Sequence, residues 1–489
     1  MYGFCGNQLK SPVLAPRNPW NNRAFWTASG SPCARLPRTS VLRALRAFCL
    51  FWTILASYAL VWVFSRWASP VARTRRFDRA HRKNAERLAS GFVRLRGVFI
   101  KAGQVLSVTG TFLPTAYGEA LAKLQDSVPA RPFSEVASRL KEAFGADALS
   151  RFGSFEREPV AAASLAQVHR ATTRDGRPLA VKVLYPDIER LVRIDLGVLR
   201  SLLPVAKLLL PVSRVERVLE QLAAMLARET DYVHERQNMQ RIRDIFAGRT
   251  DVVVPSVEAE LTRGGVLSMS FEAGVKITDR DALRGIGVES EAVAKLLVGC
   301  YFTMLFQHRV FHADPHPGNF LVRPGPQLVI LDYGAVEEVT ERLQQGMQSV
   351  VMGVMLKNDD EILRGLERMG FVAEGGDRAL LAQVGREYLG VLGSVKIQDF
   401  SKLDREQMEK IAGYDQLRGK LRQVMKSVEY PEGYFYVERT LALLFGLVGQ
   451  LAPKQGLPGL VLPYASQAFL MGVPKAPAAT TPASAEGSA

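Results

Sequence analysis

The sequence is short of the residues that build disulfide frameworks and zinc centres. Only four cysteines occur in 489 residues, at positions 5, 33, 49 and 300, and no two form a Cys-x-x-Cys pair. Histidine occurs six times and is scattered, so neither a disulfide framework nor a zinc cluster is predicted. The stretch HERQN at 234–238 resembles the start of a zinc-protease helix, but Asn238 replaces the second histidine. We therefore exclude a metalloprotease and expect a reducing, cytosolic setting.

Acidic residues are also in deficit. There are 48 Asp and Glu against 63 Lys and Arg, which gives a formal net charge of +15 and a pI near 9.7. This positive charge would suit a nucleic acid, an anionic membrane surface or a phosphate-rich ligand. The charge alone does not distinguish these three partners. Because 47% of the residues are hydrophobic, the chain is not a disordered protein and can form two or three domains.

One long apolar run stands near the N-terminus. Residues 48–65, FCLFWTILASYALVWVFS, carry no charge and are about long enough to cross a bilayer core. The alternatives are a buried helix or, if the true start lies further downstream, a cleaved signal peptide. The flank after the run carries more arginine than the flank before it, so the positive-inside rule places the C-terminal part in the cytoplasm. That flank would also bind anionic head groups, which accounts for part of the pI without nucleic acid.

Beyond this run the pattern changes from helix to strand. Residues 77–125 have apolar positions at helical spacing and contain KAGQ at 101–104, which alone indicates only a surface lysine and a close-packed glycine. Residues 159–185 predict a small-residue loop, then a strand, a turn at Asp175-Gly176 and a second strand holding Lys182. A lysine between Val and Leu favours an anionic partner such as a phosphate, although an exposed lysine on a half-buried strand is the simpler alternative.

A helix and more strands follow. Residues 214–247 predict a helix with an acidic cluster that would ordinarily face solvent. Residues 252–277 predict two strands joined at Arg263-Gly264-Gly265, and 288–309 are helical again. This order of elements predicts a small α+β lobe followed by a helical region.

The strongest chemical signal is FHADPHPGNFLVRPGPQLVILDYGAV at 311–336. It holds Asp314, then Asn319 five residues later, then a hydrophobic strand and Asp332-Tyr-Gly. Phosphoryl transfer needs a phosphate cradle, a lysine and oxygen ligands for Mg²⁺, and this order of parts is that of protein kinases. HAD stands where kinases have His-Arg-Asp, and DYG where they have Asp-Phe-Gly. The sequence therefore predicts a bilobal, kinase-like α+β fold.

At this point the chain resembles a particular family, the UbiB/AarF (ABC1/ADCK-type) atypical kinases, which are associated with ubiquinone and other isoprenoid-lipid metabolism. The resemblance covers about residues 88–450. It rests on the motifs KAGQ, AAASLAQVH, AVKV, ETDYVHE, HADPHPGN and LDYG.

The resemblance implies roles for most of the candidate site. Lys182 would contact the phosphates of ATP or ADP and pair with Glu235, while Asp332 and Asn319 would hold Mg²⁺ and Asp314 would stand at the catalytic-base position. A second set would hold the nucleotide or complete the site: the alanine-rich loop Ala161, Ala162, Ala163 and Ser164, the hinge residues Met269 and Phe271, and the extension residues Lys101, Gln104, Glu229 and Asp231. Lys101 and Gln104 would reach across the active site, with the two acidic residues as their partners. Alanine tolerates positive φ less well than glycine, so this loop should hold phosphates differently from a glycine-rich one.

Two features argue against an ordinary protein kinase. Ala313 replaces the arginine that would answer a phosphorylated activation loop. About seven residues separate Gly334 from the next predicted helix, which leaves little room for an activation segment or a platform for a peptide. The leading hypothesis is a membrane-associated kinase or ATPase acting on a small or lipid-like substrate, with a membrane lipid or a quinone or isoprenoid precursor, and other lipid-biosynthesis proteins, as partners. A nucleotide-binding scaffold without turnover and a soluble phosphotransferase resembling aminoglycoside or choline kinases are the alternatives.

These predictions divide the chain into six parts. They are a disordered basic segment (1–47), a single transmembrane helix (48–66), a helical extension (67–158), a kinase-like N-lobe (159–280), a kinase-like C-lobe (281–452) and a low-complexity tail (453–489).

Overall fold

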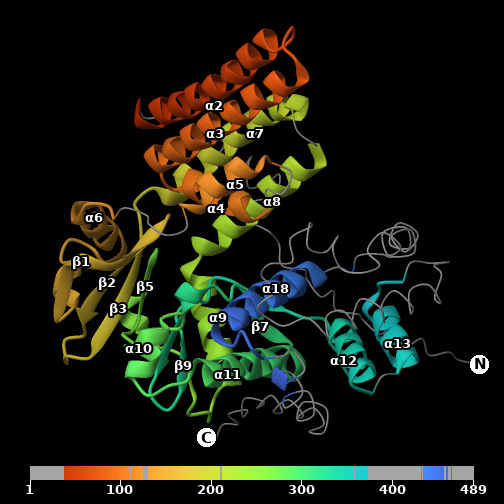
Figure 1. Ribbon diagram of the computed structural model, residues 1–489. Helices are drawn as coiled ribbons and strands as arrows, with labels where there is room; N and C mark the ends of the chain where they lie inside the picture. The colour runs from red at the N-terminus through yellow and green to blue at the C-terminus, as the bar shows by residue number, and fades with distance from the viewer. Residues whose placement is uncertain are drawn as a thin grey trace, which may run out of the picture. The chain divides into compact units, whose positions relative to one another are not determined.

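The structure is a computed structural model that describes residues 38–109, 113–124, 130–209, 212–356, 358–372, 431, 433–455, 459–460 and 464. Most of the predicted tail and most of the predicted N-terminal segment lie outside these residues. The chain divides into two compact units, residues 1–234 with 257–271 and residues 235–256 with 272–489, and each is described by itself (Figure 1).

Helices dominate the first unit. They are α2 (Arg38–Phe64), α3 (Pro70–Leu95), α4 (Val98–Thr109), α5 (Thr115–Ala122), α6 (Phe133–Phe144), the 3₁₀ helix η1 (Ala148–Arg151), α7 (Ile188–Leu209) and α8 (Val212–Glu229). Helix α2 begins at Arg38, inside the segment that was predicted to be disordered. The helix that contains the apolar run at 48–65 therefore begins ten residues before that run.

Helices α2 and α3 form an antiparallel pair, drawn side by side in Figure 1. Ser69 caps α3 by accepting from the amide of Ala72, and Pro70 fits the first helical position, where no amide donor is needed. Helix α7 packs on α2 and α4, and α8 packs on α4. These two helices lie in the stretch that was predicted as N-lobe, and they pack on the N-terminal helices.

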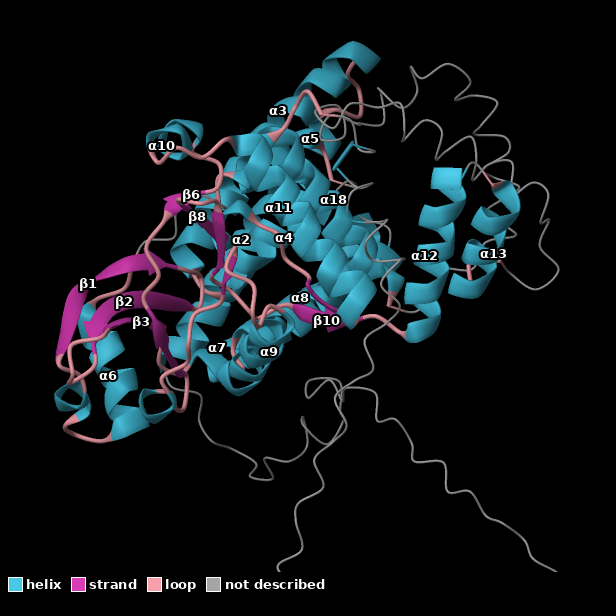
Figure 2. Ribbon diagram, turned by 90° about the horizontal axis from the view of Figure 1, so that it is seen from below, coloured by secondary structure: helices cyan, strands magenta, loops and turns pink. Residues whose placement is uncertain are grey.

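A four-stranded antiparallel sheet completes the first unit. It contains β1 (Ser154–Ala162), β2 (Ala166–Thr172), β3 (Pro178–Leu184) and β5 (Val266–Ser270), in the order β1-β2-β3-β5. Figure 2 shows α6 against this sheet, and the core between them includes Val136 and Leu140 of α6 with Val181 and Val183 of β3. Strand residues alternate between faces, so this core fixes Lys182 on the opposite face.

The predicted strand pair at 252–277 is only partly correct. Strand β5 forms, but the segment before it contributes the 3₁₀ helix η2 (Ala259–Leu261) and single bridges, Val257 to Met269 and Arg263 to Val266. Pro255 cannot donate a ladder hydrogen bond, which ends the first strand early. That strand, β4 (Val252–Val253), pairs in the second unit.

The second unit is built around a mixed sheet and a buried helix. Its strands are β4, β6 (Val275–Lys276), β7 (Val310–His312), β8 (Phe320–Arg323), β9 (Gln327–Ile330) and β10 (Val336–Glu338). The sheet has the order β4-β9-β8-β6, and β7 pairs separately with β10. Its helices are α10 (Arg280–Gly285), α11 (Ser290–Phe302), the π-helical turn η3 (Thr303–His308), the 3₁₀ turn η4 (Pro317–Asn319), α12 (Glu341–Leu356), α13 (Asp359–Met369) and α18 (Tyr434–Leu451). Helix α9 (Tyr232–Ile245) begins at the end of the first unit and continues in the second.

Candidate active site

The loop after β7 holds Asp314 and Asn319 together. The Asn319 amide nitrogen donates to the backbone oxygen of Asp314 at 3.0 Å and to its carboxylate at 3.3 Å. His316 fixes the turn between them, because its Nδ1 accepts from the Gly318 amide at 3.1 Å and its backbone oxygen accepts from the Asn319 amide at 2.9 Å. With its nitrogen committed to Asp314, the Asn319 side chain turns its oxygen the other way.

Asp332 lies beside this loop because β8 and β9 pair. The amide of Leu331 donates to the backbone oxygen of Asn319 at 2.9 Å, at the open end of the β8–β9 hairpin. Asn319 therefore lies opposite Leu331, the residue before Asp332. One carboxylate oxygen of Asp332 accepts from the Gly334 amide at 2.8 Å. The hairpin thus brings a carboxylate and an amide oxygen to the same place.

Two histidines shape this region. His312 is buried, and its Nε2 donates to the backbone oxygen of Asp332 at 2.7 Å, so its Nδ1 accepts from the Tyr301 hydroxyl at 3.3 Å. His316 is used in the turn described above. Through these contacts both histidines shape the loop.

The donor set suits a hard cation. Mg²⁺ prefers carboxylate and amide oxygens and commonly takes one or two protein carboxylates, with phosphates and waters completing the shell. Asp332 and Asn319 supply those oxygens. Among the described residues, no group of three or more His, Cys, Asp or Glu could hold a metal. With one carboxylate and one amide oxygen, the pair suits a Mg²⁺ ion whose other ligands are phosphates and waters.

Tyr333 anchors the Asp-Tyr-Gly turn from inside the core. Its ring is fully buried, its hydroxyl donates to the Ile330 backbone oxygen at 2.8 Å, and burial raises its pKa well above the ordinary value. Asn238 of α9 donates to the Tyr333 backbone oxygen at 3.0 Å. Sequence reasoning used Asn238 only to exclude a zinc protease and missed this role, because the two residues are 95 positions apart.

Arg439 was also missed. It lies on α18, and its guanidinium donates to the Asp314 carboxylate at 3.4 Å, while Thr440 donates to the Ala313 backbone oxygen at 3.1 Å. Asp314 lacks an adjacent arginine in sequence, and α18 supplies one from 125 residues away. Nothing local in the sequence signals such a contact.

The segment after Gly334 is short. The Ala313 amide donates to the Ala335 backbone oxygen at 2.7 Å, β10 pairs with β7, and α12 begins at Glu341. This pairing uses almost the whole stretch, so no extended activation segment follows the Asp-Tyr-Gly turn.

In the first unit, Lys182 lies on the sheet face away from α6. Pairing across the strands places Ala161, Val168, Lys182 and Leu267 in one row. The Lys182 ammonium lies 5.3 Å from the centre of the Tyr232 ring, a cation–π distance. The lysine and the start of the alanine-rich loop therefore share one face.

The alanine-rich loop is the tip of the β1–β2 hairpin. Ala161 and Ala162 end β1, and the Ala163 amide donates to the Ala166 backbone oxygen at 2.8 Å to close the turn around the buried Ser164. Tyr185 supports it from β3's end: its amide donates to the Leu165 backbone oxygen at 2.9 Å.

Buried polar side chains extend this support. The Tyr185 hydroxyl donates to the Gln167 side-chain oxygen at 3.0 Å, and the Gln167 nitrogen lies 3.0 Å from His169 Nε2. Burial lowers the pKa of His169, so its imidazole stays neutral, accepts from Gln167 and donates through Nδ1 to the Glu156 backbone oxygen at 2.9 Å.

The hinge residues follow β5. Met269 is buried and pairs with Ala180, and the Phe271 amide donates to the Pro178 backbone oxygen at 3.0 Å. The Arg170 guanidinium lies 4.1 Å from the centre of the Phe271 ring. Both predicted hinge residues are thus held by the edge of the sheet.

The KAGQ residues pack within the helical layer. Lys101 forms an ion pair with Glu229 at the end of α8, and Gln104 donates to the Leu124 backbone oxygen at 2.9 Å. A Cβ on Gly103 would lie 2.4 Å from the Leu124 side chain, so the glycine is needed for close packing. Asp231 accepts from the His234 amide at 3.0 Å and begins α9.

The candidate residues fall into two groups. Asp314, Asn319 and Asp332 lie together in the second unit, whereas Lys182 and the alanine-rich loop lie together in the first. Glu235 is buried at the first position of the second unit. Its pairing with Lys182 remains a prediction.

A family model for the ABC1 atypical kinase-like domain matches residues 123–366, from the end of α5 into α13. The chain belongs to this family. The predicted UbiB/AarF resemblance and the kinase-like fold are thereby confirmed. The match contains the sheet with Lys182 and the Asp314, Asn319 and Asp332 group, and it begins after KAGQ.

Several relatives carry kinase names. The protein ACTIVITY OF BC1 COMPLEX KINASE 8, chloroplastic, of Arabidopsis thaliana is 30% identical over 412 residues, 78% of this chain and 53% of its own. AarF domain-containing protein kinase 1 of Xenopus laevis is 30% identical over 327 residues, 65% of this chain and 63% of its own. The chain thus spans about half to two thirds of these relatives. The solved Rv3197–erythromycin complex from Mycobacterium tuberculosis is similar with a TM-score of 0.48 and 25% identity, over 75% of this chain and 94% of that one.

Proposed function

We propose that this ABC1-family protein is a membrane-associated atypical kinase or ATPase that binds Mg-ATP and serves ubiquinone or other isoprenoid-lipid metabolism. The observation that carries the proposal is the geometry of Asp314, Asn319 and Asp332. The Asn319 side-chain nitrogen donates hydrogen bonds to Asp314, which leaves the Asn319 side-chain oxygen for a cation. In the proposal, this oxygen and the Asp332 carboxylate are the two protein ligands of a phosphate-bound Mg²⁺.

Each candidate residue has a defined task in this proposal. Asp332 and Asn319 hold Mg²⁺, which neutralises charge on the transferred phosphoryl group. Asp314 orients and accepts the proton of the attacking hydroxyl or water. Lys182 neutralises the nucleotide phosphates from the sheet face that it shares with the alanine-rich loop.

A small or lipid-like acceptor suits the site better than a peptide. The stretch from Ala335 to α12 is occupied by the pairing of β10 with β7, so this stretch offers no free segment on which a peptide could be aligned. The kinase names of the relatives support phosphoryl transfer, and the family resemblance supports an isoprenoid-lipid context.

One contact favours a second candidate, a nucleotide-binding scaffold without turnover. Arg439 donates to the carboxylate that would act as the base. Held in this way, an Asp314 carboxylate oxygen is already occupied by the guanidinium when an acceptor hydroxyl arrives. Turnover would then require the Arg439 contact to break when the acceptor binds.

ATPase assays on the purified full chain separate these functions. We expect Mg²⁺-dependent hydrolysis that rises with liposomes containing a quinone-precursor mimic, and its loss in Asp332→Asn. A matched surface variant, Glu361→Gln on α13, should retain full activity, because the Glu361 carboxylate pairs with Arg364 of the same helix and not with a candidate site residue. Mg²⁺-dependent binding without hydrolysis would support the scaffold, whereas unchanged hydrolysis in Asp332→Asn would refute the metal assignment.

A further inference from the structure

Helix α2 is long and apolar enough to cross a membrane, but it is paired with α3 along its length. Residues Leu42–Phe64 form the apolar window. The contacts show that the two helices are antiparallel, because residue numbers rise along α2 while they fall along α3. The Phe51 and Phe92 ring centres are 6.4 Å apart, the Ser57 hydroxyl accepts from the Asn84 side chain at 3.2 Å, and the Tyr58 hydroxyl lies 2.8 Å from His81 Nδ1. At the end of α2, Arg76 donates to the Phe64 backbone oxygen at 2.5 Å. The partner therefore follows α2 through most of its apolar window.

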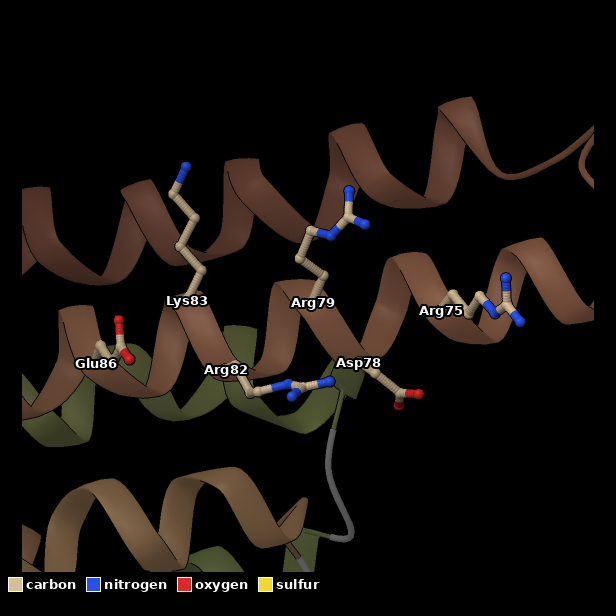
Figure 3. Close-up of a pocket in the computed structure, with 6 residues that line it drawn as sticks. All are labelled: Arg75, Asp78, Arg79, Arg82, Lys83 and Glu86. Carbon is tan, nitrogen blue, oxygen red and sulfur yellow. The ribbon is translucent and has the colours of Figure 1, made fainter.

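Helix α3 is unsuited to the interior of a bilayer. It has eight basic and two acidic residues in 26 positions: Arg73, Arg75, Arg76, Arg79, Arg82, Lys83, Arg87 and Arg94, with Asp78 and Glu86. Six of the charged side chains of α3 line an open hollow on its surface, as Figure 3 shows: Arg75, Asp78, Arg79, Arg82, Lys83 and Glu86. Charged groups in hydrocarbon are strongly unfavourable unless they face water or a partner. If α2 crossed the membrane with its packing intact, α3 would carry these charges in with it.

The outward side of α2 is nevertheless apolar. Five of its exposed large side chains recur at helical spacing, and these are Leu42 (50% exposed), Leu45 (54%), Trp52 (57%), Leu60 (57%) and Val63 (43%). Trp62 (53%) and Phe64 (67%), near the end of the helix, are exposed beside this stripe. The turn beyond the helix adds Trp67, which is 83% exposed. A helix with one apolar face beside a strongly basic helix is typical of proteins that lie on a membrane.

We propose that α2 lies in the surface of an anionic phospholipid bilayer, with the Leu42–Val63 stripe in the acyl boundary and the arginines of α3 at the head groups, and does not cross it. The occupant is assigned by charge complementarity, since α3 carries a net charge of +6 with histidine neutral (eight basic minus two acidic residues). This inference rests on the membrane association proposed above and is independent of catalysis.

Cysteine accessibility in intact cells tests the topology. In a variant of the full chain whose four native cysteines are serine, single cysteines are placed before and after the apolar window, Ser40→Cys and Ser69→Cys. We expect a membrane-impermeant maleimide to label neither site in intact cells and both after permeabilisation. Labelling of one of the two in intact cells would overturn the proposal, because a spanning helix puts its ends on opposite sides.

Vesicle flotation of the purified chain tests the bilayer as occupant. Binding should be at least tenfold stronger to vesicles with 30% phosphatidylserine than to pure phosphatidylcholine, and should weaken with salt. Leu60→Glu should lower binding to the anionic vesicles at least tenfold, whereas Leu149→Glu, at a 43% exposed leucine on η1, should not. A Leu60→Glu variant that changes from dimer to monomer but floats normally would assign the stripe to a second copy and overturn the proposal. ATPase activity without vesicles should survive in Leu60→Glu, which separates this result from a failed site.

Discussion

The ion pair between Arg43 and Asp195 fixes α2 to α7, and its removal should destabilise the first unit strongly. The Arg43 guanidinium meets both carboxylate oxygens of Asp195, at 2.8 and 2.6 Å, and also donates to the backbone oxygens of Leu95 and Arg96. Asp195 is only 1% exposed, and burial raises its pKa despite the arginine. Arg43→Met would leave this carboxylate buried without its partner.

The expected loss follows from that burial. Breaking a buried ion pair by removing one partner costs about 3–5 kcal/mol. For a unit of this size, about 1 kcal/mol corresponds to roughly 2–4 °C, so the melting temperature should fall by about 6–20 °C. Arg43→Lys should restore little, because an ammonium cannot reproduce the two-pronged contact or the backbone hydrogen bonds.

Thermal and urea unfolding, followed by circular dichroism, measure this change. The double variant Arg43→Met/Asp195→Leu should recover most of the loss, because no charge is then left buried. A control at an exposed pair, Arg177→Met, should leave the unfolding midpoint unchanged, since Arg177 and Asp175 are 60% and 62% exposed. If Arg43→Met unfolds like the unaltered protein, α2 is not an integral part of the folded unit, and the proposed membrane orientation of α2 loses its basis.

Three further predictions concern other contacts. Arg439→Leu should change the ATPase rate by about tenfold, ~1.4 kcal/mol in the activation barrier, whereas Arg364→Leu on α13 should not; equal rates would exclude a role for the Asp314 contact. Burial lowers the pKa of His169, so as pH falls this histidine is protonated in the unfolded state before it is protonated in the folded state. The stability that it contributes above about pH 6.5 should therefore be lost as pH falls. His169→Gln should flatten this part of the plot of urea midpoint against pH. Gly365→Ala should lower the unfolding free energy by about 1–3 kcal/mol, because its Cβ would lie 2.7 Å from the Gly346 oxygen, whereas Gly446→Ala on α18 has open space and should be neutral or stabilising.

The parts that the sequence predicted well are those whose signals are local. The β2–β3 hairpin follows from alternating β-branched residues around Asp175-Gly176, and the Asp-x₄-Asn loop is compact enough for Asn319 to reach Asp314. The short path to α12 also follows from counting residues after Gly334. Each depends on neighbours within a few positions, where steric and hydrogen-bonding rules act directly.

The contacts that escaped prediction join distant segments. Arg439 reaches Asp314 across 125 residues, and Asn238 reaches Tyr333 across 95. The apolar run at 48–65 was predicted to span a membrane, and the helix that contains it is long and apolar enough to do so. Length and hydropathy take no account, however, of what packs beside a helix. Contacts such as that of Tyr58 with His81 place α3 beside this run, and α3 is apolar on one side only. The charges of α3 therefore bear on whether α2 can enter a bilayer.

The central proposal is that Asp332 and Asn319 hold the metal of a bound Mg-nucleotide. Equilibrium titration of the purified chain with a fluorescent ATP analogue, in Mg²⁺ and in EDTA, tests it most directly. We predict binding that weakens by about tenfold or more, ~1.4 kcal/mol, when Mg²⁺ is removed or when Asp332 is replaced by Asn. Binding of equal strength in EDTA and in Asp332→Asn, or no binding by the unaltered chain, would contradict it.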